Sequence, residues 1–135
     1  MKPLVPTVLL LCLCSCWPVA VVKPTPVTHV VVCWCKEPGN EAARQRLINA
    51  SHSFRAIPGV VSVTAGRPIP STRPVVDSSF DVAVVMQFRD QRALRDYEQH
   101  PIHKKAVSDV LRPLTAKILI YDIRYDEYSS KLTKR

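Results

Sequence analysis

The chain has 135 residues, enough for one domain with a hydrophobic core of its own. Hydrophobic residues make up 47% of the sequence and charged residues 22%, which is typical of a globular protein and excludes a disordered chain. The formal net charge is +8, but within residues 29–124 no basic run is longer than Lys104-Lys105. Because no aromatic-basic recognition motif accompanies these charges, we expect a solvated basic surface and no nucleic-acid partner.

The first 22 residues have the layout of an export signal. A single basic residue, Lys2, precedes the apolar run Leu4–Cys14, and the segment contains no acidic residue. Within it, the tetrapeptide Leu-Cys-Ser-Cys that ends at Cys16 resembles a bacterial lipoprotein cleavage box. This resemblance implies that residues 1–16 are a signal peptide with its lipobox and that Cys16 carries the lipid.

Two other interpretations of this segment stay open. It could be an uncleaved anchor from Leu4 to Val22, which is just long enough to cross a bilayer, or an ordinary signal peptide. We therefore expect an exported protein that is either anchored to the cell-envelope membrane or periplasmic. Residues 17–27 follow as a proline-rich linker, whose extended backbone would lift the domain off a membrane.

Four segments rich in β-branched and aromatic residues predict strands: 28–36, 60–66, 80–88 and 115–124. Alternation along the first strand places His29, Cys33 and Cys35 on one face, and both faces of this strand are apolar. We interpret the two cysteines as packed apolar thiols. An intermolecular disulfide is the alternative in an oxidising compartment.

The first predicted helix covers residues 41–56. Asn40 stands where a capping residue is expected, and apolar residues recur at helical spacing along the segment. After the second strand, the proline-containing segment 67–79 shows no periodicity. A loop of this length in a small domain predicts a lid or a binding edge.

Two further helices follow the third strand. Asp90 is placed to cap the first of them, which is expected to end near His100, and Pro101 suits the first position of the next. At 100° per residue, His103 falls in the middle of the apolar arc of that last helix. The sequence therefore predicts that His103 is turned towards the interior.

The order of elements is strand, helix, strand, strand, helix pair, strand. This order predicts an α+β fold, with a four-stranded antiparallel sheet and helices on one face. The second face of the sheet is also apolar, and a symmetric dimer that packs sheet against sheet would cover it. We expect a homodimer of the domain 28–124, followed by a polar tail at 125–135.

A set of short motifs gives residues 29–124 a family likeness. The most specific is Tyr-x-x-His-Pro-x-His from Tyr97 to His103. The others are His29, Ile57-Pro58-Gly59-Val60, Gly66, Phe80-Asp81, Phe88-Arg89-Asp90 and Tyr121-Asp122. On these residues the chain resembles the stress-responsive dimeric α/β-barrel (Dabb) domain family. The resemblance implies a ferredoxin-like fold that pairs into a dimeric α/β barrel.

The same family includes plant polyketide cyclases, which use a tyrosine and a histidine of this motif as an acid–base pair. The resemblance implies catalytic roles for Tyr97 and His103. His29, on the same strand face as Cys33, could reach the cavity and bind a ligand, and so could His100, whose alternative role is to cap the break between the two helices. A third histidine of those cyclases corresponds here to Val82. Chemically, a neutral histidine can act as a base and a tyrosine hydroxyl can stabilise an enolate. Burial would favour the neutral form of His103.

Two functions follow from this interpretation. The first is a membrane-tethered dimeric barrel that binds a small, largely apolar molecule, with acid–base chemistry from Tyr97 and His103. The second is a non-catalytic dimeric envelope protein for assembly or stress tolerance, its interior filled with side chains. No cofactor is expected, and no metal either, because the histidines and cysteines lack the usual ligand spacings. A cavity bordered by Tyr97 and His103 would favour the first function.

Overall fold

The four predicted strands form one antiparallel sheet in the computed structural model, which describes residues 24–125. The strands are β1 Val27–Cys35, β2 Val60–Gly66, β3 Val82–Phe88 and β4 Thr115–Arg124, in the order β2-β3-β1-β4. The predicted α+β, ferredoxin-like arrangement is therefore confirmed, and the predicted strand ends differ from the observed ones by two residues at most.

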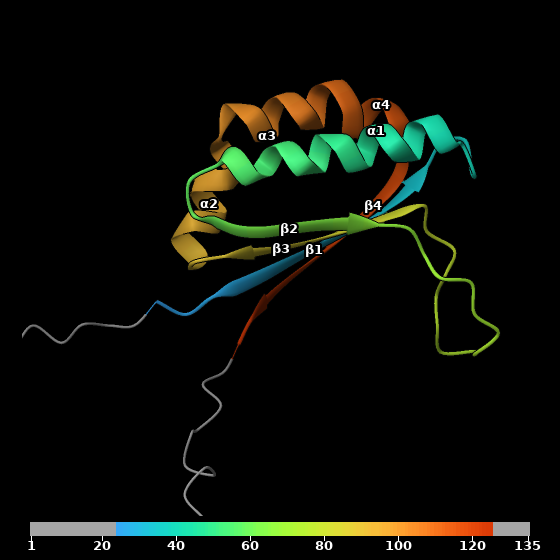
Figure 1. Ribbon diagram of the computed structural model, residues 1–135, viewed down its shortest axis with the longest axis horizontal. Coiled ribbons are helices and arrows are strands. Elements are labelled where there is room, and N and C mark those ends of the chain that lie inside the picture. The colour runs from blue at the N-terminus through green and yellow to red at the C-terminus, as the bar shows by residue number, and fades with distance from the viewer. Residues whose placement is uncertain (1–23, 126–135) are drawn as a thin grey trace, which may run out of the picture.

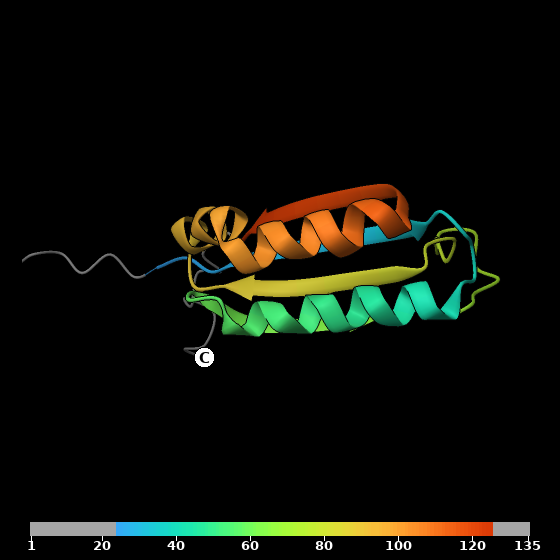
Figure 2. The ribbon, with the colours of Figure 1, turned by 90° about the horizontal axis from the view of Figure 1, so that it is seen from above.

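All the helices lie on one face of this sheet (Figure 1). They are α1 Glu41–His52, α2 Gln91–Gln99, α3 Pro101–Ala106 and α4 Arg112–Leu114. A 3₁₀ turn, Ser53–Ala56, extends α1, and a π-helical turn, Val107–Leu111, joins α3 to α4. Viewed from above, α1 and α3 run side by side along the sheet (Figure 2). Within residues 24–125, no helix combines the length and the apolar character that crossing a bilayer requires.

The predicted capping residues begin their helices as expected. The Asn40 side chain accepts a hydrogen bond from the amide of Ala43, and the Asp90 side chain accepts one from the amide of Ala93. Each bond satisfies a backbone donor that a helix start leaves unpaired. Pro101 occupies the first turn of α3, where its missing N–H has no cost.

The core lies between the sheet and the helices. Its largest fully buried side chains are Phe88, Leu47, Met86, Val82 and Cys33. Four of these five come from β1 and β3, the two central strands, and alternate residues of both strands point to the helices. Burying an aliphatic or aromatic side chain of this size stabilises a fold by about 1.5–3 kcal/mol. The helical layer is held to the sheet mainly by this set.

Asp81 ties the end of β1 to the start of α1. Its buried carboxylate accepts hydrogen bonds from the amides of Cys35 (2.8 Å) and Gly39 (3.2 Å) and from the Arg44 guanidinium (2.7 Å). Burial alone would raise the pKa of Asp81, but the Cys35 and Arg44 hydrogen bonds outweigh it and hold that pKa below its usual value. The carboxylate is therefore ionised and fixes the β1–α1 turn.

The outer face of the sheet, which points away from the helices, carries exposed apolar side chains. These are Val85 of β3 and Leu119, Tyr121 and Ile123 of β4. Beyond Thr115, every residue of β4 is exposed, because no helix covers this edge strand. The described domain therefore covers only one of the two apolar faces of its sheet.

Two glycines with positive φ provide a test of the packing of α2. At Gly59 (φ +87°) an added Cβ would lie 2.6 Å from the Cβ of Ala93, whereas at Gly39 (φ +78°) it would meet no atom within 4 Å. We expect Gly39→Ala to reduce the free energy of unfolding by about 1–2 kcal/mol, the cost of the left-handed conformation alone. Gly59→Ala should cost about 1–3 kcal/mol more, because α2 must move.

Urea denaturation of the two variants beside the parent chain measures both losses. Equal losses would contradict the close approach of α2 to the turn before β2.

Candidate functional site

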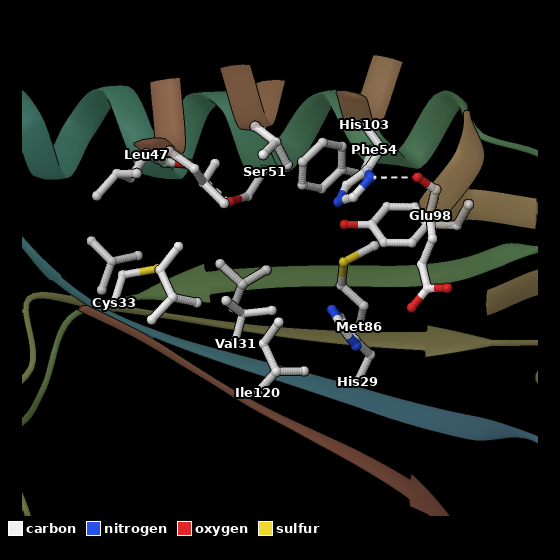
Figure 3. A pocket seen from close by; sticks show the side chains of 16 residues that line it. His29, Val31, Cys33, Leu47, Ser51, Phe54, Met86, Glu98, His103 and Ile120 are labelled. Atoms are coloured by element: carbon white, nitrogen blue, oxygen red, sulfur yellow. Dashed lines mark hydrogen bonds between the residues drawn. The ribbon is translucent and has the colours of Figure 1, made fainter. Parts of the chain in front are cut away.

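A cavity of about 270 Å³ lies between the sheet and the helical layer. Its walls are mostly aliphatic and aromatic, with side chains from β1, β3, β4, α1, α2 and α3 (Figure 3). Ile118 and Ile120 of the uncovered strand β4 border the cavity and stay 38% and 52% exposed, so this edge gives access from solvent. Because sites for drug-sized ligands enclose about 300–1,000 Å³, this volume suits a small molecule.

Tyr97 and His103 lie next to each other on the cavity wall. Their ring centroids are 4.4 Å apart, although Tyr97 is in the last turn of α2 and His103 is in α3. The break at His100–Pro101 turns the chain between the two helices, which brings the two rings together. Burial, and after it the Glu98 charge, raises the pKa of Tyr97 far above its usual value, so its hydroxyl stays protonated.

The His103 ring has a defined proton arrangement. Its Nδ1 lies 3.1 Å from the backbone oxygen of Glu98 (Figure 3). Because a carbonyl oxygen only accepts, Nδ1–H is the donor, and in the neutral ring Nε2 holds the free lone pair. Burial lowers the pKa of His103, partly opposed by the Glu98 hydrogen bond, so the ring is neutral near pH 7.

His29 is held in a similar way from the sheet. Its ring is buried, and its Nδ1 donates to the carboxylate Oδ1 of Asp122 at 2.6 Å. The register of β1 with β4 places these two residues opposite each other. The His29 ring lies 5.9 Å from the Tyr97 ring, and Figure 3 shows His29 on the sheet side of the cavity and His103 on the helical side. The structure thus brings His29, Tyr97 and His103 together.

The structure does not bring His100 to the cavity. Its Nδ1 accepts a hydrogen bond from the amide of Ile102 at 3.3 Å and caps α3. The predicted loop 67–79 supplies no lining residue either, and Figure 1 shows it on the side of the sheet away from the helices. It is therefore not part of the wall of this cavity, because it projects beyond one end of the strands and away from the helices.

Cys33 and Val82 form part of the apolar wall. Burial raises the pKa of Cys33 to about 11, so its thiol is protonated and a poor nucleophile. Cys33 and Cys35 are both free and buried, as expected for packed apolar thiols. Val82, which the family resemblance matches to a third histidine of the cyclases, is fully buried and lines the cavity. Here that position supplies no proton acceptor.

One contributor to the site was missed by sequence reasoning. Asp122 was noted only as part of a family motif, yet it fixes the His29 ring. The two residues are 93 positions apart, and only the strand register shows that they meet. Among residues 24–125, no group of three or more His, Cys, Asp or Glu side chains could hold a metal ion.

The arrangement is chemically simple. An apolar cavity holds two imidazole rings, each with Nδ1–H tied to an oxygen acceptor, and a protonated phenol lies near both. A free Nε2 can take a proton from a bound molecule, and a phenol can donate a hydrogen bond to an oxygen that gains charge. Apolar walls exclude water, which strengthens both interactions.

These features define a ferredoxin-like α+β protein with a small apolar site between the sheet and the helices. The family model of the stress responsive A/B barrel domain (Dabb) matches residues 27–125, and the chain belongs to this family. A comparison with curated proteins gave no match.

Solved structures of the same fold are numerous. A Dabb family protein with a ferredoxin-like fold from Mesorhizobium loti has a TM-score of 0.61 at 28% identity, over 73% of this chain and 95% of its own. A dimeric ferredoxin-like protein of unknown function from Thermobifida fusca has a TM-score of 0.63 at 18% identity, over 76% and 93%. A hydroxynitrile lyase from Passiflora edulis has a TM-score of 0.62 at 18% identity, over 77% and 96%.

The lowered pKa of His103 predicts a pH dependence of stability. Unfolded histidine titrates near pH 6.5, so below that value the unfolded chain binds a proton that the folded ring takes up less readily. The contribution of neutral His103 is full above pH 6.5 and is lost as the pH falls through the folded pKa. We expect the free energy of unfolding to decline from about pH 7.5 to about pH 5.5 more steeply in the parent than in His103→Gln.

Denaturant titrations at fixed protein concentration measure both slopes. Parallel slopes would contradict a half-buried His103 that folding keeps neutral.

Proposed function

We propose that the domain binds a small, largely apolar molecule in its cavity and transfers a proton to or from it through His103 and Tyr97. The observation that carries this proposal is the open cavity, which both side chains border. In a purely structural domain we would expect that space to be filled by side chains, because protein interiors are close-packed. The volume supports a ligand with about one ring.

The proposed step needs a ligand with an acidic proton close to a carbonyl or hydroxyl group. For a proton on the carbon next to a carbonyl group, His103 Nε2 takes the proton and the pair of the broken C–H bond forms a double bond to the carbonyl carbon. The π pair of the carbonyl group moves onto its oxygen. The Tyr97 hydroxyl then donates a hydrogen bond to that oxygen. His29, oriented by Asp122, faces the same cavity and can hold a second polar atom of the ligand.

Two reaction types would use this chemistry. In an aldol-type closure of the polyketide-cyclase kind, the proton comes from carbon and a carbon–carbon bond forms. In hydroxynitrile cleavage, the base removes the hydroxyl proton, the carbon–carbon bond to cyanide breaks, and a carbonyl forms. The lyase from Passiflora edulis shares the fold with this chain. The valine at position 82 removes one group of the cyclase set, so we place proton abstraction, and not cyclisation, at the centre of the proposal.

The domain is also proposed to work as a homodimer. The apolar outer face of the sheet supports this, as do the dimeric proteins of this fold from Thermobifida fusca and Bacteroides fragilis. A non-catalytic envelope role would use the same dimer, so dimerisation does not separate the two functions. The two functions differ in whether the cavity holds a ligand and whether the protein transfers a proton.

Proton transfer can be tested with single-site variants and small carbonyl probes. Deuterium exchange at the methyl group of acetophenone and cyanide release from mandelonitrile are the two readouts. His103→Gln should lower an observed rate by about 10²–10⁴-fold, because the base is lost. Tyr97→Phe should lower it by about 10²–10³-fold, because one oxyanion donor is lost.

The matched control is His100→Asn, which removes a histidine of the same motif that lies outside the cavity and keeps a capping side chain. Its rates should equal those of the parent. Native mass spectrometry of the purified protein reports retained small molecules. If every preparation has an empty cavity and the parent reacts no faster than His103→Gln, the proposed proton transfer is rejected and the non-catalytic role is favoured.

The location of the protein is a separate proposal. We infer that the chain is exported and lipid-anchored at Cys16; this rests on the sequence, since residues 1–23 lie outside the described part of the chain. In a bacterial host supplied with labelled palmitate, the parent should be labelled and found in the membrane fraction. Cys16→Ser should lose both properties, because the acceptor thiol is gone.

Cys14→Ser is the matched control, since it changes a cysteine two residues away inside the same box. It should keep the label. Labelling of Cys16→Ser at the parent level would rule out this lipid site.

A further inference from the structure

The loop between β2 and β3, residues 67–81, presents two large apolar side chains to solvent. Ile69 is 84% exposed and Val75 is 88% exposed, the highest values among the exposed large hydrophobic residues of the described chain. Single exposed apolar residues are common on protein surfaces. Two of them in one projecting loop call for a partner surface, because neither packs against the domain that carries it.

The loop is stiff for its length. Pro68, Pro70 and Pro74 restrict its backbone, and a hydrogen bond from the Val76 amide to the Arg73 carbonyl oxygen (3.0 Å) closes a turn at its tip. A segment restricted in this way loses little conformational entropy when it docks. Two apolar contacts are therefore enough for it to gain affinity for a partner surface.

The two ends of the loop are fixed differently: Arg67 pairs with the Glu41 carboxylate of α1, whereas residues 79–80 contact the outer face of the sheet. The Trp34 indole N–H donates to the Ser79 hydroxyl at 3.0 Å, and the Phe80 ring meets the Trp34 ring edge-on at 6.5 Å. Lys117 of β4 lies 4.3 Å above the same indole. Cys33 points to the cavity, and neighbouring strand residues point to opposite faces, so Trp34 points to the outer face. This second end of the loop thus lies where the exposed apolar layer of the sheet ends.

We propose that this loop is an arm that docks on a second copy of the chain. Figure 1 shows it projecting on the side of the sheet away from the helices, the side on which Val85, Leu119, Tyr121 and Ile123 are exposed. Two sheets packed face to face lie about 10 Å apart, so an arm that projects past one sheet reaches the rim of the other. The surface of the arm is continuous with that apolar face.

This inference goes beyond the proposed function, because the arm projects beyond one end of the strands and away from the helices, and it supplies no residue that lines the cavity. It adds a second contact region to a sheet-to-sheet dimer. In such a dimer each copy would both extend an arm and receive one, as two-fold symmetry requires. Each dimer therefore contains two equivalent arm contacts, and both contribute to its free energy of association.

A photo-crosslinker tests the contact directly. With benzoylphenylalanine in place of Ile69, irradiation of the purified full chain should give a covalent dimer whose crosslinked peptide belongs to the partner's sheet. The control carries the same group in place of Arg46, which is exposed on α1 in the helical layer, and should give no dimer band. Absence of a crosslinked dimer from position 69, or crosslinking to added phospholipid vesicles in its place, overturns the proposal.

Dissociation of the dimer gives a second readout. The double variant Ile69→Ser, Val75→Ser should raise the dimer dissociation constant by at least about tenfold, measured by sedimentation velocity over a dilution series. Thr72→Ser changes an exposed polar residue of the same loop and should leave the constant unchanged. An unchanged constant in the double variant, or a parent chain that stays monomeric, also overturns the proposal.

Discussion

The candidate site depends on the break in the helical layer at His100–Pro101. Proline has no N–H to donate and its ring excludes the preceding residue from helical geometry, so α2 must end there and α3 must begin in a new direction. One uninterrupted helix would space Tyr97 and His103 six residues apart and turn them to different sides. The break brings their rings to 4.4 Å. It also leaves the Glu98 carbonyl oxygen free to accept the His103 Nδ1–H.

The two histidines of the cavity are fixed by different means. His103 is bound to a backbone oxygen of the helix before it, so its orientation follows from local geometry within six residues. His29 is bound to a carboxylate on another strand, so its orientation requires the whole sheet to be assembled. Both end with Nδ1–H engaged and Nε2 available. The site therefore combines a locally determined ring with one that depends on the tertiary fold.

The fold was predictable from the sequence because the strands are rich in β-branched and aromatic residues and the three longest helices, α1, α2 and α3, begin at recognisable capping residues. The wheel position of His103 was sufficient to place it at the cavity, since α3 is regular from Pro101 to Ala106. Asp81 and Asp122 were not placed in this way. Asp81 was noted only as part of the Phe80-Asp81 motif, yet turn amides and Arg44 surround it, and Asp122 meets His29 only through register. Contacts between distant segments leave no local pattern in the sequence. The cavity leaves none either, because its volume depends on how all the elements pack.

Strand β4 contributes to two different surfaces on its two sides. Ile118, Ile120 and Asp122 point to the cavity, while Leu119, Tyr121 and Ile123 form much of the exposed outer face. Because strand side chains alternate strictly, a deletion or insertion of one residue near Lys117 would exchange the two sets in a single step. Substitutions in β4 can alter one side at a time, but a change of length alters both. The register of β4 therefore determines both which side chains line the cavity and which side chains form the apolar outer face.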